Sequence, residues 1–296
     1  MSRIEDALHK LQRERRAGPA GSAATERRAA AVAASETLRA FTLNTTQRVK
    51  LSAATLNRRG VRAWAEDRGK REFGQIKRPL IDRAAGRLAD HAVGGTIVLV
   101  TSAAPGEGKS LTTFNLALSM AAERDFSVLL VDADTIKPDL STALGLASSH
   151  GLTNLLADGA VPFEEAIWKT SVDGLYFMPA GTERSDAAEL LGSQRMRQVV
   201  QRLVEDLPHT LVLIDSSPLL LTNESPVLAA LAGQVVFVVR ANRTPRALVL
   251  EALNRLDPSK PIGLVLNGAS APEANYYYGQ YGGAKSGETA NDHSAG

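Results

Sequence analysis

The stretch TSAAPGEGKS, residues 101–110, decides the fold of this chain. It follows an apolar run and combines two glycines with a lysine and a serine. Between a strand and a helix, such a loop turns its backbone N–H groups toward phosphate oxygens. Ala103 replaces the first glycine of the strict G-x-x-x-x-G-K-S pattern, and Leu111 replaces the third glycine of a dinucleotide-binding fingerprint. The stretch therefore predicts a phosphate-binding loop, the alternative being an ordinary tight turn.

Lys109 and Ser110 carry the chemistry of the expected loop. The lysine is expected to neutralise the β- and γ-phosphates of a nucleotide, so that its side chain serves the ligand rather than the core. The serine hydroxyl is expected to ligate Mg²⁺. The residues expected to bind the nucleotide here are Pro105, Gly106, Glu107, Gly108, Lys109, Ser110 and Leu111.

Apolar runs and helical patterns alternate from residue 94 onward. Helical spacing joins Met196, Val199, Val200, Leu203 and Leu207, and Asp186 with Glu189 is the expected start of the longest helix. Continuous apolar strands between amphipathic helices indicate a mostly parallel sheet covered on both faces. The predicted fold is a doubly wound α/β P-loop NTPase domain over residues 93–268. Its strands are expected at residues 96–102, 127–134, 175–181, 210–215, 234–239 and 262–267.

Three aspartates follow or end two of these apolar runs. VLLVDAD ends with Asp132 and Asp134, and LVLIDSSP contains Asp215. In a parallel sheet the carboxyl ends of all strands lie at one edge, where the loop after residue 102 also lies. The three carboxylates are therefore expected to converge on the Mg²⁺ and γ-phosphate region.

Composition and charge separate an arm from a body. The 296 residues are 44% hydrophobic and contain no cysteine, which excludes disulfides, Cys-ligated zinc and iron–sulfur clusters. No apolar run approaches the ~20 residues that span a bilayer, and no signal peptide is visible, so a cytoplasmic protein is expected. Residues 1–92 hold 20 Lys and Arg against 10 Asp and Glu, whereas the remainder holds 14 against 22.

The basic half divides into two expected regions. Residues 1–35 form an arm and linker in which Ile4, Leu8 and Leu11 share one helical face, and residues 36–92 are expected to be helical. The arm could bind an anionic membrane surface or an acidic protein, or it could only aid solubility. No aromatic residue occurs in residues 1–40, so nucleic acid is not expected as a partner.

Three motifs resemble those of one family. APGEGKS (104–110), VDADTIKP (131–138) and LIDSSP (213–218) are similar to the Walker A, Walker A′ and Walker B motifs of bacterial tyrosine kinases. AELLGSQRM (188–196) resembles the segment before their Walker B strand, and NYYYGQYGG (275–283) resembles their tyrosine cluster. The opening MSRIEDALHKL is similar to exosortase-associated autokinases, a less specific match. The resemblance covers about residues 70–282.

The resemblance implies an ATP- and Mg²⁺-dependent protein-tyrosine autokinase. It implies phosphorylation in trans, ring-like homo-oligomers, and peripheral membrane association through a polysaccharide co-polymerase that controls exopolysaccharide synthesis and export. Ser110 and Asp132 are expected to hold the metal, with Asp215 acting on it directly or through water. A tyrosine hydroxyl, with a pKa near ~10, must lose its proton, so Asp132 or Asp134 is the expected base. Asn267, at the end of the last apolar run, contacts the adenine or closes a turn.

The carboxyl-terminal segment, residues 269–296, is expected to be a flexible tail that carries the acceptors. Four of the five tyrosines fall within six residues, flanked by glycines and without periodicity. An adhesive tail is the alternative. The expected phosphoacceptors are Tyr276, Tyr277, Tyr278 and Tyr281.

Two departures bear on assembly and on the alternative function. The family's oligomerisation motif E-x-x-R-x-x-R is represented by Glu72, Gln75 and Arg78, so a glutamine replaces the middle arginine and Lys77 is a cation that could compensate. The alternative function is a MinD/ParA-like ATPase switch without kinase activity. Those ATPases carry a signature lysine where this chain has Ala104.

Overall fold

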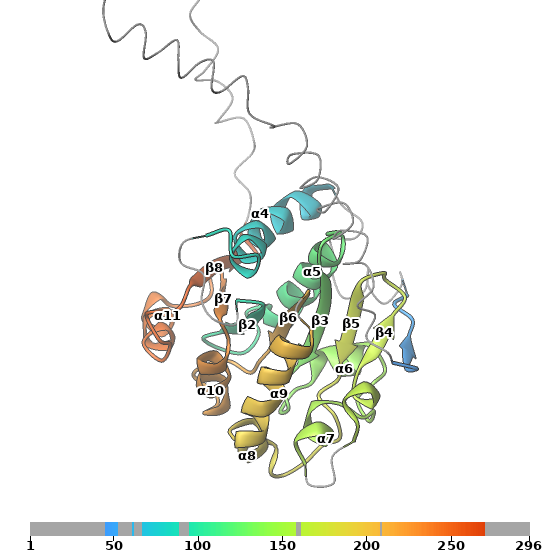
Figure 1. The fold of residues 1–296 in the computed structure, drawn as a ribbon. Coiled ribbons are helices and arrows are strands. Elements are labelled where there is room, and N and C mark those ends of the chain that lie inside the picture. Colours follow the sequence, from blue (N-terminus) through green and yellow to red (C-terminus); the bar gives the residue numbers. More distant parts are fainter. Residues whose placement is uncertain are drawn as a thin grey trace, which may run out of the picture.

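The computed structural model describes residues 45–52, 61, 67–88, 95–157, 161–207 and 209–269. Their centre is one eight-stranded sheet in the order β1-β4-β5-β3-β6-β2-β7-β8 (Figure 1). Every neighbouring pair of strands is parallel except β4 with β5, which confirms a mostly parallel sheet. The strands are β1 (Arg48–Val49), β2 (Ile97–Ser102), β3 (Ser127–Asp132), β4 (Trp168–Thr170), β5 (Leu175–Met178), β6 (Thr210–Asp215), β7 (Gln234–Arg240) and β8 (Ile262–Asn267).

Helices cover both faces of this sheet. One hydrophobic core lies beneath α4, α5 and α6, and the other lies beneath α7 to α11. Figure 1 shows α4 and α5 on one side of the strands and α8, α9 and α10 on the other. The helices are α4 (Asp67–Ala84), α5 (Lys109–Ala121), α6 (Asp139–Ala143), α7 (Leu152–Leu156), α8 (Ala187–Leu191), α9 (Gln194–Asp206), α10 (Glu224–Leu231) and α11 (Arg246–Leu253).

Strand β2 shows why apolar runs predict this architecture. Ile97 and Leu99 point into one core, while Val98 and Val100 point into the other, and all four are fully buried. A strand with both faces buried cannot alternate polar and apolar residues, so its sequence is continuously apolar. The six predicted runs accordingly correspond to β2, β3, β5, β6, β7 and β8.

The expected helix start at Asp186 is wrong in one respect. Asp186 precedes the five-residue α8 and makes no side-chain cap, because its carboxylate accepts two hydrogen bonds from Arg184 at 2.7 and 2.8 Å. The longer α9 begins instead after Ser193, whose Oγ accepts a hydrogen bond from the Met196 N–H at 3.3 Å. A serine at this position caps a helix as well as an aspartate does, and the sequence analysis did not identify Ser193 as this cap.

Helix α4 is fastened to α5 by one lysine. Lys77 Nζ donates a hydrogen bond to the Ser119 carbonyl at 2.7 Å and pairs with Glu123 Oε1 at 2.7 Å. The lysine therefore points toward α5 rather than lying on the surface with Gln75, and its expected compensation for Gln75 stays a prediction. The Arg78 side chain is 81% exposed, and its Nε lies 4.0 Å from Asp82 Oδ2 within the same helix.

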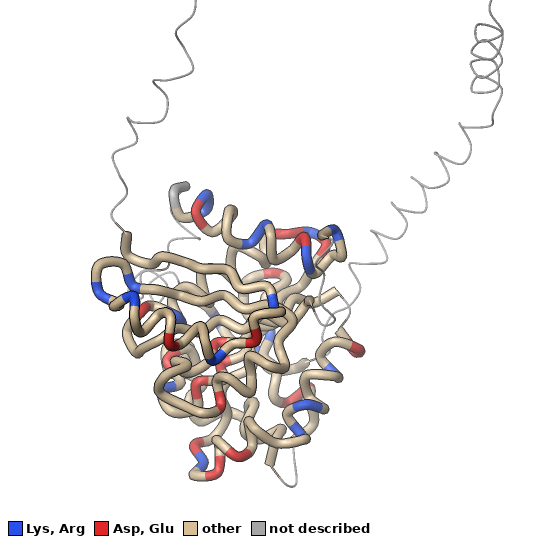
Figure 2. Tube along the Cα trace, turned by 90° about the vertical axis from the view of Figure 1, so that its left-hand side faces the viewer, with Lys and Arg blue, Asp and Glu red and all other residues tan. Residues whose placement is uncertain are grey.

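The carboxyl end of β8 lies beside a basic turn. The turn between β7 and α11 carries Arg240, Arg243 and Arg246, and Figure 2 shows this concentration of Lys and Arg near the end of β8. No helix in the described part of the chain has the length and apolarity needed to cross a bilayer. The amphipathic arm and the tyrosine cluster lie outside the described residues.

Candidate functional site

Three adjacent parallel strands bring the predicted site together. β3 and β6 are paired so that Asp132 lies directly opposite Asp215, and β6 also pairs with β2. The loop after β2 leads into α5, whose first residue is Lys109. Because these strands run the same way, the loop and the aspartates meet at one edge of the sheet.

The loop adopts the conformation that its glycines permit. Gly106 and Gly108 have φ values of 82° and 90°, in the left-handed region that favours glycine. A Cβ on Gly108 would come within 1.9 Å of Asn267 Nδ2, so a side chain there is excluded twice over. Ala103 is not among the described residues of positive φ, and it lies fully buried. This backbone therefore does not require the missing glycine at that position.

The side chains of Glu107, within the loop, and Asn267, at the end of β8, hold the loop in place. Glu107 is buried, and its Oε2 accepts a hydrogen bond from the Ala104 N–H at 2.7 Å. Its Oε1 accepts a hydrogen bond from the Thr244 hydroxyl, which links the loop to the turn after β7. Asn267 Nδ2 donates to the Glu107 carbonyl at 2.8 Å. Asn267 therefore supports the loop, and its expected contact with adenine stays a prediction.

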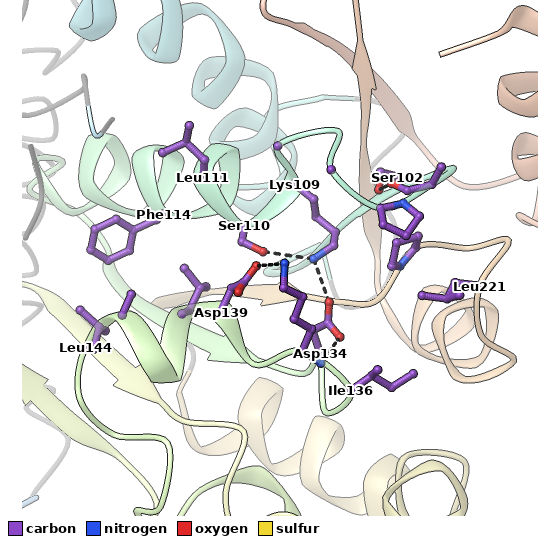
Figure 3. Close-up of a pocket in the computed structure, with 18 of the residues that line it drawn as sticks. Ser102, Lys109, Ser110, Leu111, Phe114, Asp134, Ile136, Asp139, Leu144 and Leu221 are labelled. Carbon is purple, nitrogen blue, oxygen red and sulfur yellow. Dashed lines mark hydrogen bonds and ion pairs between the residues drawn. The ribbon is translucent and has the colours of Figure 1, made fainter. Parts of the chain in front are cut away.

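Lys109 is the central cation of the site. Its Nζ lies 3.3 Å from Asp134 Oδ2, 3.2 Å from Asp215 Oδ1 and 3.2 Å from Ser110 Oγ, and Figure 3 shows it extending toward Asp134. Burial alone would lower the pKa of this lysine, but Asp215 and Asp134 together raise it above its usual value. The side chain is therefore charged at any physiological pH.

Asp215 is fully buried and has one carboxylate oxygen without a hydrogen-bond donor among the described residues. The Thr113 hydroxyl donates to its Oδ1 at 3.1 Å, whereas its Oδ2 is buried and accepts no hydrogen bond from the described residues. Burial raises the pKa of this carboxyl, and Lys109 opposes the rise. A buried carboxylate oxygen without a donor is suited to a cation or to a water bound by a cation.

Asp134 and Asp132 differ in access. Asp134 lines the cavity, where Ser217 Oγ donates to its Oδ1 at 2.8 Å while its Oδ2 faces Lys109. Asp132 is fully buried and does not line the cavity, and its Oδ2 accepts hydrogen bonds from Ser141 N and Oγ at 2.8 and 2.7 Å. The geometry therefore favours Asp134 as the group that meets an incoming substrate.

The buried Asp132 should give the ligand-free protein a distinctive pH dependence. Burial, together with the charge of Asp215, raises its pKa from 3.8 to about 7, against hydrogen bonds from Ser141. Between pH ~4 and ~7 the folded state then holds a proton that the unfolded state has lost. The free energy of unfolding should fall with rising pH by at most about 1.4 kcal/mol per unit from this group.

Asp132→Asn should remove this component of the slope. Urea denaturation of the wild type and the variant at pH 5, 6, 7 and 8 measures it, with the partly exposed Asp139→Asn as the control. Parallel stability profiles for wild type and Asp132→Asn would contradict the assignment.

Sequence reasoning missed the hydroxyl groups that orient the carboxylates. Ser217 lies two residues after Asp215, inside the quoted LIDSSP motif, and could have been found there. Thr113 lies one helical turn after Lys109 and therefore on the same face of α5. Ser141 has no comparable signal, because the fold of the β3–α6 connection alone brings it to Asp132.

The cavity beside these groups has a volume of about 300 Å³ and is lined by Lys109, Ser110 and Asp134, whereas Asp132 and Asp215 do not line it. Its other polar lining residues are Ser102, Lys137 and Asp139, and apolar side chains and the backbone of the loop form the rest of its wall. No group of three or more His, Cys, Asp or Glu in the described ranges forms a ready-made metal cage. Mg²⁺ does not need one, since it commonly uses one or two protein ligands beside phosphate oxygens and waters.

A phosphate loop at the carboxyl edge of a doubly wound sheet, with a lysine between two strand-end carboxylates, defines a P-loop nucleotide-binding protein. Residues 95–248 match the family described as an AAA domain, which is more than half of the chain. "Tyrosine-protein kinase YwqD" of Bacillus subtilis is 32% identical over 187 residues, covering 62% of this chain and 77% of that protein. "Tyrosine-protein kinase CpsD" of Streptococcus agalactiae is 32% identical over 190 residues, covering 63% and 81%.

Solved structures agree with these relatives. The VpsO kinase domain is 29% identical with a TM-score of 0.54, and the match covers 66% of this chain and 98% of that domain. The BceF tyrosine kinase domain is 25% identical with a TM-score of 0.58, covering 76% and 95%. The chain belongs to the bacterial tyrosine-protein kinases of the AAA-domain family, and it is a protein-tyrosine kinase.

The chain corresponds to only part of some relatives. "Putative tyrosine-protein kinase EpsB" of Ralstonia nicotianae is 34% identical over 203 residues, which is 68% of this chain but 26% of that protein.

Proposed function

We propose that this kinase transfers the γ-phosphoryl group of ATP to tyrosines of its own carboxyl-terminal cluster. The arrangement of Lys109 between Asp134 and Asp215, at the edge where β8 also ends, carries the proposal. Asn267 is the last residue of β8 and touches the phosphate loop, so the chain that follows it starts at this site. The proposed acceptors are Tyr276, Tyr277, Tyr278 and Tyr281.

The loop and its neighbours would hold ATP and Mg²⁺. The backbone N–H groups of residues 106–111 would bind the phosphates, and Lys109 would neutralise the charge on the β- and γ-groups. Ser110 and Asp215 fit as metal ligands, because the serine hydroxyl lies beside Lys109 Nζ and Asp215 has a free buried oxygen. Asp132 lies opposite Asp215 on the neighbouring strand and would attract the ion through its charge. Bound Mg²⁺ would supply positive charge that stabilises the leaving diphosphate.

Asp134 is the proposed base for the acceptor. It would accept the phenolic proton as the tyrosine oxygen forms its bond to the γ-phosphorus. The bond between that phosphorus and the β–γ bridging oxygen breaks, and its electron pair leaves with ADP. Lys109 would stabilise the charge that shifts to the bridging oxygen during this loose transfer.

Reach permits transfer between subunits. Tyr276 lies nine positions after Asn267, a span of at most about 30 Å when extended. This span can reach a neighbouring subunit's site in a homo-oligomer as well as its own site, and we propose phosphorylation in trans because the sequence resembles kinases that work in this way. The arm of residues 1–35 is proposed to recruit the kinase to a membrane-bound polysaccharide co-polymerase, and phosphorylation would regulate exopolysaccharide synthesis and export.

Incubation with ATP and Mg²⁺, followed by phosphotyrosine mapping, tests the proposal. The variant with Phe at positions 276, 277, 278 and 281 should lose at least about nine-tenths of the phosphotyrosine of the wild type. The fifth tyrosine, Tyr176, is buried in β5 and serves as an internal control. ATP hydrolysis without any phosphotyrosine on the wild type would favour a MinD/ParA-like switch instead.

The exposed face of α4 gives a prediction for assembly. We propose that Glu72 and Arg78 contribute to a contact between subunits, and that Gln75 weakens it because glutamine lacks the charged fork of arginine. Gln75→Arg should raise the fraction of oligomer at a given concentration several-fold, measured by light scattering before and after ATP. Arg78→Gln should lower it, and unchanged mass for both variants would remove α4 from the interface.

A further inference from the structure

The cavity has an apolar rim that phosphate binding does not require. Ile136 and Leu221 line it, although their side chains are 64% and 55% exposed. Figure 3 places both of them on the side of the cavity where Asp134 lies. Single exposed aliphatic residues are common on protein surfaces, but two at the mouth of one polar site indicate a ligand with an apolar part.

The two residues come from different loops and meet only through the fold. Ile136 lies two residues beyond Asp134, in the connection from β3 to α6, and Leu221 lies in the connection from β6 to α10. Each loop follows a strand that ends in a site aspartate. The rim therefore follows the same two strands as the carboxylates, so the fold fixes its position relative to them.

We infer that Ile136 and Leu221 form an acceptor subsite, which holds the phenol ring of an incoming tyrosine while its hydroxyl reaches Asp134. This inference rests on the proposed function and names the residues that select its acceptor. A tyrosine side chain combines an apolar ring with a polar tip, which matches an aliphatic rim in front of a carboxylate. Asp134 is almost completely buried, so a serine hydroxyl, held close to its backbone, reaches it less well.

The order of the strands separates this rim from the Asn267 side of the loop. Ile136 and Leu221 follow β3 and β6, which lie on one side of β2, whereas Asn267 and Thr244 lie with β7 and β8 on the other side. The phosphate loop after β2 lies between them. A nucleotide can therefore extend along one side of the loop while an acceptor enters from the other.

Acceptor kinetics with added peptide test the subsite. The protein carries Phe at its own four cluster positions, and a synthetic peptide of residues 272–283 is the only acceptor. Ile136→Ser and Leu221→Ser should each raise the KM for the peptide about tenfold. The kcat at saturating peptide and the KM for ATP should change less than about twofold. Ile136→Leu, which keeps an aliphatic side chain, should retain the wild-type KM for the peptide.

Leu264→Ser is the matched control, because Leu264 is 62% exposed on β8 and does not line the cavity. It should leave the KM for the peptide unchanged. An unchanged KM in both rim variants would overturn the inference, as would a rise in the KM for ATP, which would assign the rim to the nucleotide.

Peptide binding separates this inference from the proposed function. Fluorescence anisotropy of a labelled peptide does not depend on turnover, so it reports the rim even in a protein that transfers no phosphate. Weaker peptide binding to both rim variants, with no phosphotyrosine on the wild type, would support the subsite. The same result would contradict the proposed phosphoryl transfer. Equal binding to wild type and rim variants would defeat the subsite, whatever the activity.

Discussion

Lys109→Met is expected to lower tyrosine phosphorylation about 10³-fold. Lys109 Nζ is the cation nearest to the two carboxylates and to Ser110, where the transferred phosphoryl group is proposed to lie. Methionine has a similar length but no charge, so the charge that shifts to the bridging oxygen loses its counterpart. Quantitative phosphotyrosine detection under saturating ATP and Mg²⁺ measures the change.

The same substitution should also destabilise the ligand-free protein, contrary to what the sequence alone suggested. Lys109 is buried between Asp134 and Asp215, and its removal leaves two buried carboxylates without a cation. Breaking such an arrangement costs on the order of 3–5 kcal/mol. Because burial raises the pKa of Asp215, a proton binds there more readily as the pH falls, so the cost should shrink as the pH is lowered.

Lys77→Met distinguishes the two effects. Lys77 is also a mostly buried lysine in an ion pair, but it joins α4 to α5 away from the cavity. Its replacement should destabilise the protein but leave phosphorylation of an added acceptor peptide, which does not require contact between subunits, intact at a temperature where both variants are folded. Phosphotyrosine at wild-type levels in folded Lys109→Met would contradict the assignment of the loop.

Asp134→Asn is expected to lower kcat for tyrosine phosphorylation by about 10²-fold or more. The asparagine retains the shape of the side chain and can still accept the hydrogen bond from Ser217, but it cannot take up the phenolic proton. The KM for ATP should change little, because the backbone of the loop binds the phosphates. Steady-state kinetics with a saturating acceptor peptide separates kcat from KM.

Two other aspartates complete this test. Asp139 lines the same cavity, but its carboxylate is paired with Lys137 at 3.3 Å, so Asp139→Asn should retain kcat. Asp132→Asn should reduce kcat less than Asp134→Asn, because Asp132 is bound by Ser141 behind the cavity wall. A larger loss for Asp132→Asn would move the role of base to Asp132.

Six of the eight strands were predictable because burial on both faces leaves a continuous apolar run. Strands β1 and β4 were not, and they contain two and three residues that include Arg48 and Lys169. Residues this few and this polar carry no strand signal of their own. Their pairing depends on β5, which β4 joins in antiparallel fashion, so only the assembled sheet defines them.

The site was predictable to the extent that its residues follow strands. Lys109, Asp134 and Asp215 stand next to apolar runs, and parallel strands must bring such positions to one edge. What differs between Asp132 and Asp134 was not predictable, since both belong to one D-x-D motif. Their surroundings differ through Ser141 and Ser217, which approach from α6 and from the segment after β6.

The contact of Asn267 with the phosphate loop has a consequence for how this kinase selects its acceptor. In a homo-oligomer, a segment attached next to the catalytic edge would be present at the neighbouring site at an effective concentration on the order of millimolar. An acceptor site with millimolar affinity would then be half occupied by the attached tyrosines, so the proposed subsite of two aliphatic side chains would not need to bind tightly. Proteins in free solution at micromolar concentration would occupy the same site rarely. Attachment, rather than recognition of a sequence, would decide which tyrosines are modified.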